Sequence, residues 1–216
     1  MKRMAAACVI LGFVTAAQGT MVITEFMYSG YSDGTIKISE FVEFTNIGTS
    51  PVNMAGWSYD DDSRTPGSVD LSAFGIVQPG ESVILAEGLA SDFITGWGLS
   101  GVKVIGSNSH NLGRADEINL YDASSMLVDR LTYNDQGSGS VAGPRARYYS
   151  ANPPSLASLG TNYYADWGLS SVGDVYGSWA NGYTDVANPG VFTLIPEPAT
   201  AAFLALGGMA LLRRYR

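Results

Sequence analysis

The sequence has very little cysteine and histidine. Its only cysteine, Cys8, lies in the N-terminal apolar run, so an intramolecular disulfide and a zinc site built from several thiolates are both excluded. The only histidine, His110, lies in the turn "SNSHNLG", and no Gly-x-Ser-x-Gly motif accompanies it. We therefore interpret His110 as an ordinary loop residue and predict neither a zinc site nor nucleophilic catalysis at it.

Basic residues are also scarce. The chain has 12 Lys and Arg against 20 Asp and Glu. The basic residues of the two end segments are Lys2, Arg3, Arg213, Arg214 and Arg216. Residues 20–194 therefore hold 19 carboxylates and 7 basic side chains, a net charge of −12. A field of this sign repels phosphate backbones, so we predict no nucleic-acid partner.

Neither end contains a long hydrophobic run. Residues 1–19, "MKRMAAACVILGFVTAAQG", have a basic start, a short apolar run and small residues at Ala17 and Gly19. This is the pattern of a secretory signal peptide, which signal peptidase removes. Near the other end, residues 199–212 would form a helix of only about 21 Å, against a hydrocarbon core of about 30 Å. We expect a short membrane helix that holds the chain there temporarily.

The last segment, residues 195–216, joins this apolar run to two further features. Pro196, Glu197 and Pro198 precede the run, and three arginines follow it: Arg213, Arg214 and Arg216. The prolines keep the tripeptide extended, and the arginines stay on the cytoplasmic side of the membrane. The arrangement resembles the PEP-CTERM sorting signal of Gram-negative bacteria. The resemblance implies recognition and cleavage by a membrane-embedded exosortase and delivery to the cell surface or the extracellular matrix.

Between the ends, apolar residues recur at every second position in several short runs. The clearest runs cover residues 22–28, 36–46, 82–87, 117–122 and 126–133, and weaker ones lie near 56–59, 69–74 and 102–105. Turn sequences rich in Gly, Pro, Asn and Asp separate them. Alternation of this kind predicts half-buried strands, and seven or eight of them suffice for two packed sheets. The fold class expected is all-β.

Residues 20–135 carry a series of landmarks in one order. They are "ITEFMYSG" at the entry strand, "EFVEFTNIGTSPVNMAGWSYDD" with its Gly-Trp pair, "VQPGESVILAE", and the closing hairpin "NLGRADEINLYDASSMLVDRLTYND". This ordered set resembles the lamin-tail domain, which implies an immunoglobulin-like β-sandwich.

Residues 136–194 continue past the point where that resemblance ends. The segment is rich in Gly and Ser, yet it holds Trp167, Trp179 and several tyrosines. It is too aromatic for a free linker, and its many glycines and serines argue against a separate core. We expect this extension to pack on the sandwich. Whether its rings form a binding platform for sugars or partners, or only cover the core, stays open at this stage.

The most suggestive polar cluster is the loop "YDDDSRTPGSVD". It holds four carboxylates: Asp60, Asp61, Asp62 and Asp70. Adjacent carboxylates repel each other and gain from sharing a hard cation such as Ca²⁺. The alternative is a solvated acidic turn in which Arg64 pairs locally, and the spacing does not match an EF-hand. Glu40 and Glu43 are expected on opposite faces of one strand, where they could not act on one substrate.

These observations lead to three hypotheses of function. The first is an exported, non-enzymatic module of the cell surface or extracellular matrix, sorted by an exosortase-type system and contacting a polysaccharide or surface protein. The second is a calcium-dependent carbohydrate-binding or adhesive module. The third, an extracellular hydrolase, needs two carboxylates converging in a cleft, which none of the expected strands provides. Apart from calcium in the second hypothesis, no cofactor is expected.

Overall fold

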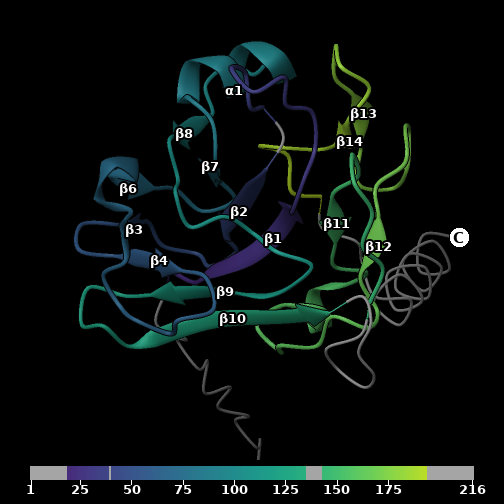
Figure 1. Cartoon of the computed structure of the whole chain (residues 1–216). Helices are drawn as coiled ribbons and strands as arrows, with labels where there is room; N and C mark the ends of the chain where they lie inside the picture. Colours follow the sequence, from purple (N-terminus) through teal and green to yellow (C-terminus); the bar gives the residue numbers. More distant parts are fainter. Residues whose placement is uncertain (1–18, 39, 135–142, 194–216) are drawn as a thin grey trace, which may run out of the picture.

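The structure, a computed structural model, describes residues 19–38, 40–134 and 143–193 (Figure 1). The expected signal peptide and the expected sorting signal lie outside these residues. In the part of the chain that is described, two β-sheets and two small β-ribbons dominate, and no helix is long and apolar enough to cross a membrane. The all-β fold class predicted from the sequence is confirmed.

The larger sheet has six strands and is antiparallel except at one edge. In spatial order the strands are β12 (Gly168–Leu169), β11 (Ala151–Asn152), β1 (Met21–Met27), β2 (Phe41–Asn46), β7 (Ser82–Ala86) and β8 (Lys103–Ile105). Only the pair β7 and β8 is parallel. A parallel pair needs a crossover, and the helix α1 (Ala90–Trp97) lies within it.

The second sheet has four antiparallel strands. They are β10 (Leu127–Asn134), β9 (Ala115–Tyr121), β4 (Ser58–Asp60) and β5 (Val69–Asp70). The two ribbons pair β13 (Trp179–Ala180) with β14 (Val186–Ala187), and β3 (Val52–Asn53) with β6 (Ile76–Val77). Two short 3₁₀ turns, η1 (Ser72–Phe74) and η3 (Leu156–Ser158), complete the described elements.

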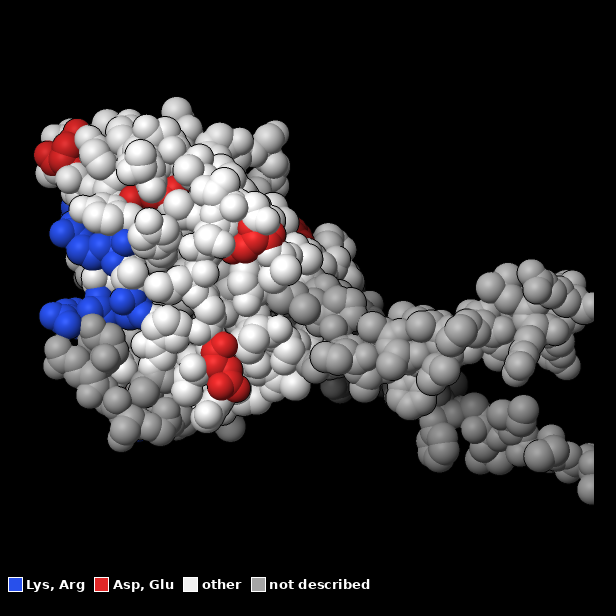
Figure 2. Space-filling view, turned by 90° about the vertical axis from the view of Figure 1, so that its right-hand side faces the viewer, with Lys and Arg blue, Asp and Glu red and all other residues white. Residues whose placement is uncertain are grey.

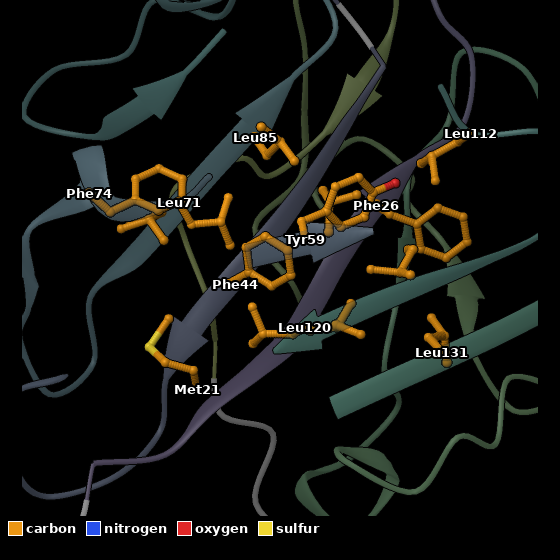
Figure 3. Packing of buried hydrophobic residues seen from close by; sticks show 14 of the residues in the cluster. Met21, Phe26, Phe44, Tyr59, Leu71, Phe74, Leu85, Leu112, Leu120 and Leu131 are labelled. Atoms are coloured by element: carbon orange, nitrogen blue, oxygen red, sulfur yellow. The ribbon is translucent and has the colours of Figure 1, made fainter. Parts of the chain in front are cut away.

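The main hydrophobic core lies between the two sheets (Figure 3). Phe44 of β2 and Tyr59 of β4 are fully buried there, with ring centroids 6.5 Å apart. A β-bulge interrupts the pairing of β1 with β2 between Ile23 and Glu25. Because the bulge inserts one residue, Ile23 and Phe26 both reach this core although they are three positions apart.

The other face of the six-stranded sheet is covered as well, although the alternating pattern predicted strands with only one buried face. Part of the cover is α1, whose Phe93 and Trp97 pack against Phe41 with ring centroids 5.3 and 6.4 Å away. The rest of the cover is the extension, whose Asn188 and Gly190 bind buried polar side chains of this face. All seven residues of β1 and all six of β2 are therefore buried.

The extension contributes directly to the sandwich. Its strand β11 pairs with β1 through Ala151 and Phe26. Two of its aromatic side chains, Tyr164 and Trp167, are buried in the main core, with ring centroids 5.5 and 6.1 Å from that of Phe26. The extension is thus one body with the strands that precede it in the chain.

The observed elements differ from the predicted ones at several places, and the six two-residue strands of the ribbons and the extension were not predicted: β3, β6, β11, β12, β13 and β14. The strand predicted over 36–46 begins only at Phe41, because Lys37 forms an isolated bridge to Ser32 in the preceding loop. The run 69–74 divides into β5 and the turn η1. The helix α1 was not predicted. It is short, its N-cap residue Leu89 makes no side-chain cap, and the left-handed Gly98 (φ 65°) ends it.

Candidate functional site

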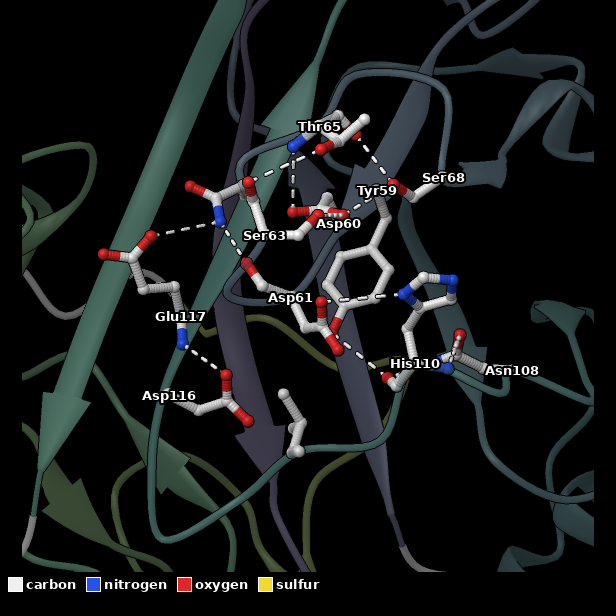
Figure 4. Close-up of polar contacts among 12 residues, drawn as sticks. Tyr59, Asp60, Asp61, Ser63, Thr65, Ser68, Asn108, His110, Asp116 and Glu117 are labelled. Carbon is white, nitrogen blue, oxygen red and sulfur yellow. Dashed lines mark hydrogen bonds and ion pairs between the residues drawn. The ribbon is translucent and has the colours of Figure 1, made fainter.

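The acidic loop singled out in the sequence begins on the four-stranded sheet (Figure 4). Asp60 is the last residue of β4, where it pairs with Asn119 of β9, and its side chain is fully buried. Its Oδ1 accepts hydrogen bonds from the hydroxyls of Ser63 (2.7 Å) and Ser68 (2.6 Å), and its Oδ2 accepts one from the Thr65 N–H (3.2 Å). Asp60 therefore organises the loop that follows it.

The pKa of Asp60 reflects these contacts. Burial raises the pKa of this carboxyl, but the hydrogen bonds from Ser68, Ser63 and Thr65 outweigh burial and lower it below its ordinary value. Asp60 is consequently an anion at neutral pH, although its side chain is buried.

Asp61 turns toward the loop that carries His110. The Nδ1 atom of His110 lies 3.5 Å from the Oδ1 of Asp61, and the two side chains are 34 % and 20 % exposed. Asp60, Asp61 and His110 each offer a ligand atom, and these atoms lie within 4.8 Å of one another. In the described parts of the chain this is the one such group of three His, Cys, Asp or Glu residues.

His110 is held by its main chain. Its carbonyl accepts hydrogen bonds from the Asn108 Nδ2 (2.8 Å) and the Tyr59 hydroxyl (3.4 Å), and its N–H donates to the Asn108 Oδ1 (3.2 Å). The interpretation of His110 as an ordinary loop residue missed its proximity to Asp61. No local signal could have revealed that proximity, because Asp61 and His110 are 49 positions apart in the sequence.

The other two predicted calcium ligands lie outside this group. Asp62 is exposed, and Asp70 is an exposed residue of β5 whose Oδ1 accepts the Ser72 N–H (2.9 Å). The guanidinium of Arg64 does not pair locally as the alternative expected. It binds Glu117 of β9 through two hydrogen bonds of 2.8 and 2.5 Å.

The sequence matches the family model of the lamin tail domain over residues 14–135. The chain belongs to the lamin tail domain family. The β-sandwich expected from the resemblance is thereby supported by both the match and the two packed sheets. A search of curated proteins found no match.

Two glutamates of the lamin tail domain serve its architecture. Glu40 accepts a hydrogen bond from the Leu112 N–H (2.7 Å), and Glu43 accepts one from the Gly190 N–H (2.6 Å). They bind different segments, as expected for two opposite faces. Burial is the main reason that the pKa of Glu40 is raised, to about 8.

Two carboxyl groups do face each other in the structure, and the sequence alone did not predict this pair. Glu25 of β1 lies opposite Glu43 of β2, and both side chains are completely buried. Burial, followed by the charge of Glu43, raises the pKa of Glu25 well above its ordinary value. The pair lies beneath the extension rather than in a cleft, so its geometry supports a structural role.

Two shallow pockets lie near the lamin tail domain's loops. The larger, of about 400 Å³, is lined mostly by polar residues, among them Lys37, Glu87, Asn108 and Asn111. Lys37 and Glu87 form an ion pair at its wall. The smaller, of about 260 Å³, lies between α1 and the extension. It is lined by Ile36, Ile38, Asp92, Thr95, Gly96, Gly182 and Tyr183.

Proposed function

We propose that this lamin tail domain protein is an exported, non-enzymatic interaction module of the cell surface or extracellular matrix. The observation that carries the proposal is the surface of the extension. In Figure 2 the side of the molecule formed by β11 to β14 is largely uncharged, its visible Lys and Arg gather at one edge, and its carboxylates are scattered. Such a surface suits a polymer or protein of low charge rather than an ionic ligand.

Exposed tyrosines of the extension support this proposal. Tyr149, Tyr163 and Tyr183 are 42 %, 41 % and 38 % exposed. Tyr183 is stacked on Tyr31 with ring centroids 4.2 Å apart, which fixes its orientation. A tyrosine ring offers apolar area with a polar tip, so it suits sugars and protein surfaces that are partly hydrated.

Sorting by an exosortase-type enzyme is part of the same proposal. It rests on the sequence of residues 195–216 alone, and the signal peptide rests on residues 1–19. Together they would expose residues 20–194 outside the cytoplasm of a Gram-negative bacterium after temporary anchoring in the membrane.

A binding experiment tests the interaction module. The purified protein is titrated with extracellular polysaccharide from its host, and the double variant Tyr149→Ser/Tyr163→Ser is compared with Ile76→Ser. Ile76 is 54 % exposed and lies on β6, outside the extension. We expect the double variant to bind about tenfold more weakly and Ile76→Ser to bind normally. Equal binding by all three proteins would contradict this role of the tyrosines.

A second experiment tests export and sorting. Intact masses are measured for protein recovered from the medium and the membranes of the host, and of a strain that lacks the sorting enzyme. Loss of residues 1–19 and cleavage near Pro196 in the first strain only is the expected result. A full C-terminus in both strains would overturn the sorting proposal.

The calcium-dependent adhesive module remains a second candidate because Asp60 and Asp61 lie together. Calcium should then raise the melting temperature, and Asp60→Ala/Asp61→Ala should abolish that rise. We place the extracellular hydrolase last. Glycosidase carboxylates need access to a substrate, whereas Glu25 and Glu43 are 0 % exposed.

A further inference from the structure

We propose that Asp60, Asp61 and His110 form a binding site for one divalent transition-metal ion of the zinc type, which clamps two loops of the sandwich together. The site is distinct from the calcium loop expected from the sequence, because it drops Asp62 and Asp70 and adds the imidazole. It is independent of the proposed function.

The spacing of the three side chains fits this ion. Tetrahedral zinc binds N and O ligands at about 2.0–2.2 Å, so neighbouring ligand atoms lie roughly 3.3 Å apart. The Nδ1 of His110 and the Oδ1 of Asp61 are 3.5 Å apart, and all three ligand atoms lie within 4.8 Å of one another. Small side-chain rotations would close the remaining gap.

The chemistry of the donors selects the metal. Calcium and magnesium take oxygen ligands, whereas imidazole suits zinc, copper, iron and nickel. Two carboxylates with one imidazole make a neutral site with a divalent ion, and a fourth position stays open for water. The guanidinium of Arg64, the cation within the acidic loop, is bound to Glu117 and leaves these two carboxylates without its charge.

Outer contacts fix each ligand in place. The Asp60 carboxylate is held by Ser63 and Ser68, and the carbonyl of Asp61 accepts a hydrogen bond from the Asn119 side chain. The loop of His110 is held through Asn108. Partners of this kind orient ligands and strengthen metal binding in known sites.

The site is also accessible and joins distant segments. The side chains of His110 and Asp61 are 34 % and 20 % exposed, so an ion can reach these two ligands from solvent, whereas Asp60 is buried. Asn108 and Ser109, close to His110 in the sequence, line the pocket of about 400 Å³. A bound ion would connect the loop after β4 with the loop before β9.

Titration of the full chain with Zn²⁺ and with Ca²⁺, followed by calorimetry, tests the proposal. All proteins carry Cys8→Ser, because a free thiolate would bind zinc as well. His110→Gln and Asp61→Asn remove ligands, while Asp62→Asn and Asp70→Asn remove exposed carboxylates of the same loop as matched controls.

The expected result is one Zn²⁺ per chain, with binding weakened at least about tenfold in His110→Gln and Asp61→Asn and changed less than about twofold in both controls. Calcium should bind more weakly than zinc and should not distinguish His110→Gln. NMR of the single imidazole, that of His110, provides a second readout. Zn²⁺ should shift the resonances of this imidazole in both control variants.

Three results would overturn the proposal. They are unchanged zinc binding in His110→Gln, equal weakening by Asp62→Asn or Asp70→Asn, and no saturable binding below millimolar zinc. If His110→Gln failed to fold, the comparison of Asp61→Asn with Asp62→Asn and the imidazole signals would still decide between a site and a simple ion pair.

Discussion

The two faces of the six-stranded sheet are both buried but are built differently. One face packs Met21, Ile23, Phe26, Val42 and Phe44 against the four-stranded sheet. The opposite face is apolar only beneath α1, around Phe41. Its remaining part, called the polar face below, carries polar side chains that are 0–6 % exposed: Thr24, Glu25, Glu43, Thr45 and Ser82. An apolar face gains stability from area and tolerates rearrangement, whereas each group on a buried polar face needs its own partner.

Most partners of the polar face come from its own strands or from the extension. Glu43 accepts a hydrogen bond from the Thr24 hydroxyl (2.7 Å) and from the Gly190 N–H (2.6 Å). Glu25 accepts hydrogen bonds from the Ser150 hydroxyl and from the Asn188 N–H (2.9 Å). Directional hydrogen bonds to these two carboxyl groups therefore position the end of the extension.

The largest effect is expected on the apolar face. Phe44 is fully buried between the sheets, so Phe44→Ala should lower the free energy of unfolding by about 3–5 kcal/mol through lost burial and a cavity. Denaturant unfolding followed by tryptophan fluorescence measures this loss. A loss below about 1 kcal/mol would mean that the sheets do not pack here as described.

A smaller and more local effect is expected on the polar face. Glu43→Ala leaves the Gly190 N–H without its buried acceptor, which should cost about 1–3 kcal/mol. Glu25→Gln should cost less than Glu43→Ala. The raised pKa of Glu25 favours the protonated carboxyl, and glutamine resembles that form. The same unfolding assay checks the order, and an equal or greater loss in Glu25→Gln would contradict it.

The pH dependence of stability should reveal the partly buried carboxyl group of Glu40, which directly precedes β2. The folded-state pKa of Glu40 is about 8, above its unfolded value of about 4.5, so the folded state binds more protons between these values. Stability from this group is present at low pH and is lost as pH rises toward 8. The slope from Glu40 should reach at most about 1.4 kcal/mol per pH unit.

Glu40→Gln isolates this contribution from that of other groups. The variant should show a shallower fall in the free energy of unfolding between pH 5 and pH 8 than the wild type, measured in matched buffers. An unchanged slope would show that Glu40 ionises in the folded protein as it does in the unfolded chain.

The smallest effect is expected outside both faces, at the tip of the hairpin between β9 and β10. Met126 is 64 % exposed, so Met126→Ser should change the free energy of unfolding by less than about 0.5 kcal/mol. A loss above about 1 kcal/mol in the same assay would show that this residue contacts a surface in solution.

The apolar face was predictable from the sequence, whereas the polar face was not. Alternating residues predicted the strands, because a period of two follows directly from strand geometry. The pairing of Glu25 with Glu43 depends on strand register and on a bulge, which alternation does not encode. The helix α1 has no capping side chain and contains Gly96, so local signals for it are weak.

Two of the three residues of the candidate site were predictable from the sequence. Asp60 and Asp61 were identified because adjacent carboxylates in a loop indicate cation chemistry. His110 was assigned to an ordinary turn, since its proximity to Asp61 arises from the packing of two loops far apart in sequence. The position of the extension likewise follows from long-range contacts such as that of Phe26 with Trp167.

Hydrogen exchange of the full chain tests the central claim most directly, that the extension is held on the polar face by Glu25 and Glu43. In the wild type, the amides of Asn188 and Gly190 should be protected. In Glu25→Ala/Glu43→Ala they should exchange much faster while β9 and β10 keep their protection. Fast exchange at Asn188 and Gly190 already in the wild type, or an equal loss of protection in all strands of the variant, would contradict the account.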